Sequence, residues 1–236
     1  MSTYVQVLLF SFLVPFLFSF HPKIKFYKRW SAFFTANFLV TVPFLIWDEI
    51  FVRCKVWGFS SEHLLGLTIF SLPIEEILFF IVIPYCCVFT YEVLSIFFAK
   101  VSFSTKKINL ILGIILFISS IFLFDRLYSF YTFFSLSLIL IYLYFFDKRF
   151  LKDFYLTYLL ITITFFIIVN GILTGGMTGG FLNTPPVWYN NSENLNIRFW
   201  TIPVEDFFYS FLLLLTNIWL YEIFKKRFYR KKKVIN

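Results

Sequence analysis

Long apolar runs separated by short polar stretches dominate this sequence of 236 residues. A helix needs roughly 20 apolar residues to cross the hydrocarbon core of a bilayer. Seven runs have a suitable length, and they are residues 4–20, 31–48, 73–98, 108–124, 127–146, 154–173 and 203–224. The pattern therefore predicts an all-α polytopic membrane protein with seven transmembrane helices.

Composition agrees with this pattern and excludes other classes of protein. Hydrophobic residues make up 60% of the chain, charged residues make up 14%, and Phe alone occurs 38 times. A soluble domain of this size could not bury so much apolar surface. The net charge of +8 would suit a nucleic-acid partner, but long apolar runs separate the charges. We therefore expect the lipid bilayer, and no nucleic acid, as the environment of the chain.

The basic residues predict an orientation in the membrane, because cytoplasmic loops carry an excess of Lys and Arg. One side of the predicted bundle holds 17 of the 21 basic residues: Lys23, Lys25, Lys28, Arg29, Lys100, Lys106, Lys107, Lys148, Arg149, Lys152, Lys225, Lys226, Arg227, Arg230, Lys231, Lys232 and Lys233. The other side holds Arg53, Lys55, Arg126 and Arg198. We expect a cell-membrane protein with its N-terminus outside and its C-terminus in the cytoplasm.

The sequence also repeats itself. Residues 73–92 and 203–222 match at an offset of 130, and both begin with Pro-x-acid-acid and end with Tyr-Glu. Each copy lies in the last of three predicted spans, and a further span between the triplets restores the direction of the chain. This arrangement predicts two parallel three-helix repeats joined by a linker helix. The first repeat would comprise residues 1–100, the linker 101–126 and the second repeat 127–236.

The repeated acids are the main candidates for chemistry. Glu75, Glu76, Glu205 and Asp206 begin helices, where the helix dipole alone would favour carboxylates. However, the motif occurs twice, beside apolar runs where ionisable groups are expensive and usually functional. A carboxyl in an apolar cavity can keep its proton and act as a general acid. Because the spans are apolar on every side, periodicity does not say which acid of each pair faces the bundle interior.

Other candidate sites are weaker. Asp48, at the end of the second predicted span, lies at the same depth as the motif acids, and Arg198 is a possible ion-pair partner for one of them. His21 and His63 fall in different loops, and the three Cys residues have no metal-binding spacing. The chain has no Walker, HExxH, CxxC or DDxxD motif. We therefore expect neither a metal site nor a bound cofactor.

The paired motifs resemble the signatures of the membrane-integral lycopene cyclases. The resemblance is carried by PIEEILFF at 73–80 and IPVEDF at 202–207, with WGF at 57–59, LTG at 173–175 and the stretch 190–198. It extends over nearly the whole chain, which is similar to the fused form of the heterodimeric bacterial enzymes found in archaea and in fungal bifunctional proteins. The second half has Asn170-Gly171 where the first has Asp48-Glu49, so Asp48 is not duplicated.

This resemblance implies a lycopene β-cyclase of carotenoid biosynthesis. Such an enzyme is an isomerase that converts the open ψ-ends of lycopene into β-rings by acid catalysis, without a redox cofactor. By matching position, Glu75 and Glu205 are the first candidates for proton transfer, with Glu76 and Asp206 as their partners and Asp48 and Arg198 in support. The resemblance also implies other carotenoid-pathway enzymes as partners.

Two alternatives remain open at this point. A cyclase acting on a C50 carotenoid would share the fold and motifs. A small proton-coupled transporter would also place acids in a repeated membrane fold. A transporter should carry polar residues through its spans toward the cytoplasm, and such residues are sparse between the two ends of 73–98 and 203–224.

Overall fold

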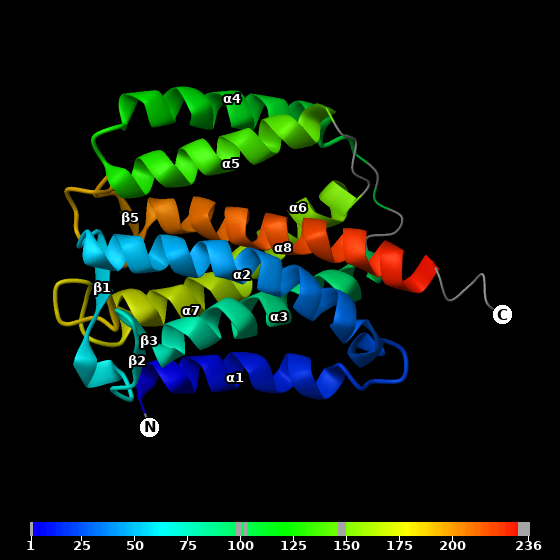
Figure 1. Cartoon of the computed structure of the whole chain (residues 1–236), viewed down its shortest axis with the longest axis horizontal. Helices are drawn as coiled ribbons and strands as arrows, with labels where there is room; N and C mark the ends of the chain where they lie inside the picture. The colour runs from blue at the N-terminus through cyan, green and yellow to red at the C-terminus, as the bar shows by residue number, and fades with distance from the viewer. Residues whose placement is uncertain (1, 98–100, 102, 146–149, 231–236) are drawn as a thin grey trace.

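The computed structural model describes residues 2–97, 101, 103–145 and 150–230. Long helices lie side by side along one axis, and the first described helix begins at one end of the bundle while the last one ends at the other (Figure 1). The α-helices are α1 (Thr3–Phe18), α2 (Trp30–Arg53), α3 (Ile74–Phe97), α4 (Lys106–Phe122), α5 (Leu127–Phe145), α6 (Phe150–Ile161), α7 (Ile167–Gly171) and α8 (Val204–Arg230). Two π-helical turns, Thr162–Phe166 and Ile172–Gly176, continue α6 and α7, and two short 3-10 helices lie at Phe26–Arg29 and Ser61–His63.

Five helices of the described chain are long and apolar enough to cross a membrane, namely Phe26–Arg53, Ile74–Ile96, Leu127–Phe145, Phe150–Gly176 and Val204–Tyr229. The predicted all-α membrane fold is thus confirmed in outline. The predicted spans 4–20 and 108–124 correspond to α1 and α4, which have 16 and 17 residues. These two helices are shorter than the roughly 20 residues that a perpendicular span needs. The count of seven spans therefore stays a prediction.

Some of the predictions fall outside the described residues. They concern the ends of two predicted spans, several basic residues, and the outer limits of the predicted repeats. These positions are 1, 98, 146 and 236 and the residues Lys100, Lys148, Arg149, Lys231, Lys232 and Lys233.

The outward surface of the bundle is apolar, as a bilayer environment requires. Phe10, Phe38 and Phe122 are 70%, 68% and 77% exposed, and many other large apolar side chains also point outward. Inside, aromatic and aliphatic side chains such as Phe33, Phe80 and Leu215 form a continuous core. Since exposed apolar patches of this extent are unusual on soluble monomers, this surface supports insertion in lipid.

Helices of the first half pack against helices of the second half. α2 packs against α8, and α6 packs against α3, while α1 packs against α3 and α5 against α8. α4 and α5 form a close hairpin, in which a Cβ added to Gly113 would lie only 2.9 Å from Cγ1 of Ile141. The two halves therefore share one hydrophobic core, and α4 lies on the flank of the bundle (Figure 1).

Short strands, which the sequence did not predict, organise the outer loops. β2 (Thr68–Ile69) pairs with β3 (Leu72–Pro73), and β5 (Arg198–Phe199) pairs with β6 (Ile202–Pro203). The two hairpins have the same register at the offset of 130, and their turns contain Phe70 and Trp200, with φ of 55° and 58°. Each hairpin leads directly into a helix that carries a pair of motif acids.

A third ladder joins the two outer loops to each other. β1 (Trp57–Phe59) pairs with β4 (Val187–Tyr189), so that Trp57 lies opposite Tyr189 and Gly58 opposite Trp188. The glycine is needed for this approach, because a Cβ at position 58 would lie 2.4 Å from Cζ2 of Trp188. The ladder brings the two halves together at the end of the bundle that carries the motif acids.

Candidate active site

The motif acids lie in the first turns of α3 and α8. Proline suits the first position of a helix, which would place Pro73 and Pro203 there, but each proline instead ends a strand, and the helices begin at Ile74 and Val204. The reason is the ladder partner of each proline, because Pro73 pairs with Thr68 and Pro203 with Arg198. The acids are therefore the second and third residues of their helices, and they point to different sides.

The first acid of each pair accepts hydrogen bonds from the loop in front of it. Oε1 of Glu75 accepts the N–H of Leu65 at 2.6 Å and the hydroxyl of Ser2 at 3.4 Å. In the second half, Oε1 of Glu205 accepts the N–H of Leu195 at 2.6 Å and the hydroxyl of Ser129 at 2.6 Å. Both side chains are fully buried. The two halves thus use the same contact, ten residues upstream in each case.

The second acids point to tyrosines instead. Glu76 accepts a hydrogen bond from the hydroxyl of Tyr4. Asp206 accepts three hydrogen bonds, from the hydroxyls of Tyr128 at 2.5 Å and Tyr189 at 2.9 Å and from Nδ2 of Asn170 at 2.6 Å. Both acids are buried. The donor to Glu76 comes from α1 in the first half, and the donors to Asp206 come from α5, α7 and β4 in the second half.

Asp48 joins the second acids. Its Oδ1 accepts the indole N–H of Trp57 at 2.6 Å, while its Oδ2 is buried and has no hydrogen-bond partner among the described residues. Asp48 and Asp206 both lie close enough to Glu76 to interact with it electrostatically. The structure therefore brings together three buried carboxyl groups, and we call Asp48, Glu76 and Asp206 the carboxyl trio.

Aromatic rings cover the carboxyl trio. The ring of Trp57 lies 5.0 Å from that of Tyr128, 6.2 Å from that of Tyr189 and 5.9 Å from that of Tyr209, between centroids. Tyr128 and Tyr189 stack at 5.8 Å. Tyr209 interacts electrostatically with all three members of the trio. Since aromatic faces attract cations, this cluster can stabilise positive charge that develops beside the acids.

Arg198 lies at the edge of this site. Its guanidinium donates to the carbonyl of Thr201 at 2.7 Å and to Oδ1 of Asn191 at 2.9 Å, and it lies over the ring of Tyr189 at 5.7 Å. No hydrogen bond from Arg198 to a motif acid is found among the described residues. Burial lowers the pKa of Arg198, and the nearby negative groups, Asp206 and Glu205 among them, oppose that shift. It thus contributes positive charge at a distance.

Tyr189 is a stable hydrogen-bond donor in this setting. Burial and the adjacent negative charge of Asp206 raise the pKa of Tyr189 well above its usual value. Its phenol therefore keeps its proton and continues to donate to Asp206.

Sequence reasoning missed the aromatic members of the site: Tyr4, Trp57, Tyr128, Tyr189 and Tyr209. They lie on elements distant in the sequence, and tyrosine is common throughout the chain, so no local pattern distinguishes them. The WGF stretch at 57–59, part of the resemblance above, was the one available signal. Metal-binding geometry is absent from the part of the chain that the structure describes, where no group of three or more His, Cys, Asp or Glu could hold an ion.

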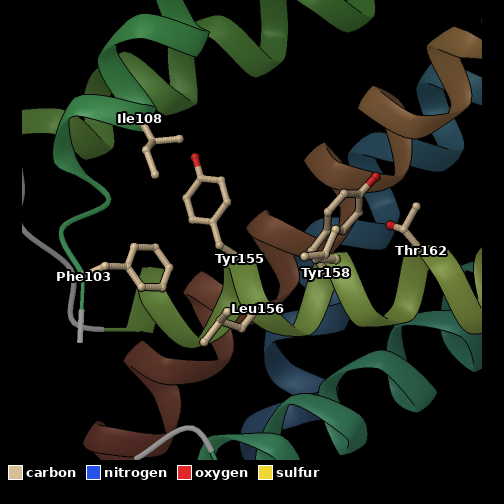
Figure 2. Close-up of a pocket in the computed structure, with 7 residues that line it drawn as sticks. Phe103, Ile108, Tyr155, Leu156, Tyr158 and Thr162 are labelled. Atoms are coloured by element: carbon tan, nitrogen blue, oxygen red, sulfur yellow. The ribbon is translucent and has the colours of Figure 1, made fainter. Parts of the chain in front are cut away.

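Two apolar grooves lie on the outside of the bundle. One, of about 340 Å³, is lined by Phe103, Ile108, Tyr155, Leu156, Tyr158, Leu159 and Thr162, and Figure 2 shows these side chains around α6. The other, of about 420 Å³, lies between α2, α3 and the β2–β3 hairpin, and its lining includes Glu49 and Ile77, the sequence neighbours of Asp48 and Glu76. Neither groove includes the carboxyl trio in its lining.

Comparison with known proteins identifies the family of this chain. Residues 1–94 and 125–224 match the family model described as lycopene cyclase. The two matched stretches lie on either side of α4. No solved structure matches the chain.

Curated relatives include fungal proteins named bifunctional lycopene cyclase/phytoene synthase. The protein of Leptosphaeria maculans is 36% identical over 73 residues, which is 31% of this chain and 12% of the relative. That of Colletotrichum graminicola is 34% identical over 61 residues, 26% of this chain and 10% of the relative. The matches thus cover about a tenth of each relative's length. On the strength of the family match over most of its length, the chain belongs to the lycopene cyclase family.

Proposed function

We propose that this chain is a lycopene β-cyclase of carotenoid biosynthesis, which converts the ψ-ends of lycopene into β-rings inside the membrane. The carrying observation is that Asp48 and, from the other half, Asp206 both interact electrostatically with buried Glu76, next to a cluster of aromatic rings. The family match supports the assignment of substrate. Since the relatives' names combine a cyclase with phytoene synthase, we propose other carotenoid-pathway enzymes as partners.

The proposed reaction transfers one proton in and one proton out. A protonated carboxyl adds its proton to the terminal double bond of a ψ-end, which leaves a tertiary carbocation. The next double bond attacks this cation, so that a carbon–carbon bond closes a six-membered ring and the positive charge moves into the ring. A carboxylate then removes a ring proton and a double bond forms. Substrate and product are isomers, and this scheme therefore involves no redox cofactor.

The residues of this chain can serve each stage. We propose that proton transfer occurs within the set of motif carboxyls, Glu75, Glu76, Glu205 and Asp206, with Asp48 and Arg198 in support. A buried site strengthens electrostatic stabilisation, because the effective dielectric constant is lower there than in bulk water. The rings of Trp57, Tyr128, Tyr189 and Tyr209 would stabilise the cationic intermediate through their faces.

We further propose seven membrane-spanning helices in two parallel repeats, residues 1–100 and 127–236, joined by a linker at 101–126. The equal hairpins before α3 and α8 support this layout. So does the position of α4 between the two stretches that match the family. The distribution of Lys and Arg supports a cell-membrane location with the N-terminus outside and the C-terminus in the cytoplasm.

Expression in a lycopene-accumulating bacterial host tests the proposed activity. We expect pigment chromatography to show lycopene replaced by carotenes with one and two β-rings, because the host supplies substrate in its own membrane. An empty vector is the control. Unchanged lycopene, with the intact protein present in the membrane fraction, would contradict the proposal, and rings of another type would correct the product.

A further inference from the structure

We propose that both halves share one proton-transfer centre, the carboxyl trio, and that Glu75 and Glu205 are positioning residues that hold the outer loops. This inference rests on the proposed function and assigns a separate role to each group of acids. It reverses the order of importance that the sequence suggested, in which the first acid of each motif came first. It also makes the chain an enzyme with a single centre, although its motif occurs twice.

The contacts of the first acids carry the positioning role. Glu75 and Glu205 each accept a backbone N–H ten residues upstream at 2.6 Å, and this contact closes the loop in front of the helix. The two hairpins are also closed by equivalent hydrogen bonds. The N–H of Ile74 donates to the carbonyl of Leu67, and the N–H of Val204 donates to the carbonyl of Ile197, each at 2.9 Å. Hydrogen bonds that hold a loop in shape are expected to have the same geometry in both halves, and these do.

The unpartnered oxygens of the first acids are compatible with this role. Oε2 of Glu75 and Oε2 of Glu205 are buried without a hydrogen-bond partner among the described residues. A neutral carboxyl would leave its other oxygen free to accept the loop N–H, and the amide of glutamine offers the same acceptor. The loop contact therefore does not require a group that can exchange a proton.

The contacts of the trio, in contrast, differ from one half to the other. Asp206 accepts three donors, whereas Asp48 accepts one and keeps Oδ2 without a partner among the described residues. A charge on Glu76 in this apolar interior would be repelled by charges on both Asp48 and Asp206, so we infer that the trio shares protons. The three donors make Asp206 the best place for the negative charge, and hydrogen bonds to a charged form favour that form.

This difference assigns the direction of proton transfer. Asp48 and Glu76 together hold the proton that is added to the ψ-end, and the Asp206 carboxylate accepts the proton that leaves the ring. Tyr189 and Asn170 are positioning residues for Asp206, since both donate to its Oδ2. Because Asp48 has no counterpart in the second half, where Asn170 donates to Asp206 instead, the second half cannot assemble a duplicate centre.

A single centre has a consequence for the product. The two ends of lycopene must react one after the other at the same carboxyls, so a one-ring carotene is an intermediate on the way to two rings. Substitution of any member of the trio should then affect both ring closures. If each half instead served one end, Asp48→Asn would impair one closure only.

The test compares matched substitutions in the lycopene-accumulating host. We expect Glu75→Gln and Glu205→Gln to retain at least about a tenth of the wild-type rate, because the amide still accepts the loop N–H, while Glu75→Ala and Glu205→Ala fall at least about tenfold below them. We expect Asp48→Asn, which keeps the acceptor for Trp57, to lose about 100-fold or more in both one-ring and two-ring products.

Two outcomes would overturn the inference. One is loss of activity in Glu75→Gln as complete as in Glu75→Ala. The other is one-ring product from Asp48→Asn at the wild-type rate. Proteolysis of the outer loops gives a readout that does not depend on activity, since the Ala variants should be cleaved faster than the Gln variants. If wild-type protein forms no rings, the proposed function fails, yet equal cleavage of Ala and Gln variants would still reject the positioning role.

Discussion

Replacement of Glu76 by Gln, or of Asp206 by Asn, should reduce ring formation by about 100-fold or more, the usual contribution of a positioned acid or base. Each substitution removes a group that exchanges a proton and preserves the size of the side chain. The amide oxygen at position 76 can still accept from Tyr4. The amide oxygen at position 206 can still accept from Tyr189 and Asn170, with its NH2 group directed at the hydroxyl of Tyr128, so the local fold should persist. Initial rates of lycopene loss, normalised to protein in the membrane, provide the measurement.

Glu62→Gln is the matched control for this pair. Glu62 lies in the outer loop that precedes α3, but it is exposed and outside the carboxyl trio, so we expect ring formation at the wild-type rate. Wild-type rates in Glu76→Gln or Asp206→Asn would exclude that residue from proton transfer. Normal one-ring but absent two-ring product in either variant would instead indicate a separate centre in each half.

The second large effect is expected at the opposite end of the bundle. Glu92 of α3 is 4% exposed and pairs with Arg29 and Lys225, whose side chains are 33% and 28% exposed. It also accepts the hydroxyl of Tyr221 at 2.7 Å, while Tyr91 donates to Glu222 at 3.3 Å, so the repeated Tyr-Glu pairs cross between α3 and α8. These contacts join the two halves of the bundle at this end.

Glu92→Ala should therefore destabilise the bundle. Removal of one partner from a fully buried ion pair costs about 3–5 kcal/mol, and we expect about 2–3 kcal/mol here because both cations are partly exposed. A loss of that size should lower the thermal unfolding midpoint in detergent by roughly 5–10 °C. The measurement is a thermal denaturation curve of the purified protein.

Arg53→Ala is the control for Glu92→Ala. Arg53 also pairs with an acid, Glu49 at 2.6 Å, but its side chain is 64% exposed. Exposed pairs contribute little, so we expect an unchanged midpoint. A midpoint for Glu92→Ala equal to that of Arg53→Ala would show that the crossed Tyr-Glu contacts do not stabilise the fold.

Hydropathy was sufficient to predict the helical elements, because lipid requires every backbone group of a span to be paired within its helix. Hydropathy could not decide whether α1 and α4 cross the membrane. They have 16 and 17 residues, and at that length crossing depends on helix tilt and on packing against neighbouring helices. Hydropathy also gave no sign of the short strands, since pairs such as Trp57 with Tyr189 join segments more than a hundred residues apart.

The motif acids could be found from repetition, but their roles could not. Helices that are apolar on all sides carry no periodic signal for the inward face. Only the tertiary structure shows that Glu75 binds the preceding loop whereas Glu76 belongs to the carboxyl trio. Asp48 was a weaker candidate than the motif acids, and its position is not duplicated in the second half. The structure explains its single occurrence, since the second half contributes Asn170 as a donor to Asp206.

Deuterium incorporation tests the claim of proton-initiated cyclisation most directly. Purified protein in lycopene-containing vesicles would be assayed in D2O, and the carotenes analysed by mass spectrometry. Carboxyl protons exchange with solvent between turnovers, so we expect about one deuterium for each ring formed, since the acid adds one proton per closure. Rings formed in D2O without deuterium would contradict a carboxyl proton donor and, with it, the proposed role of the trio.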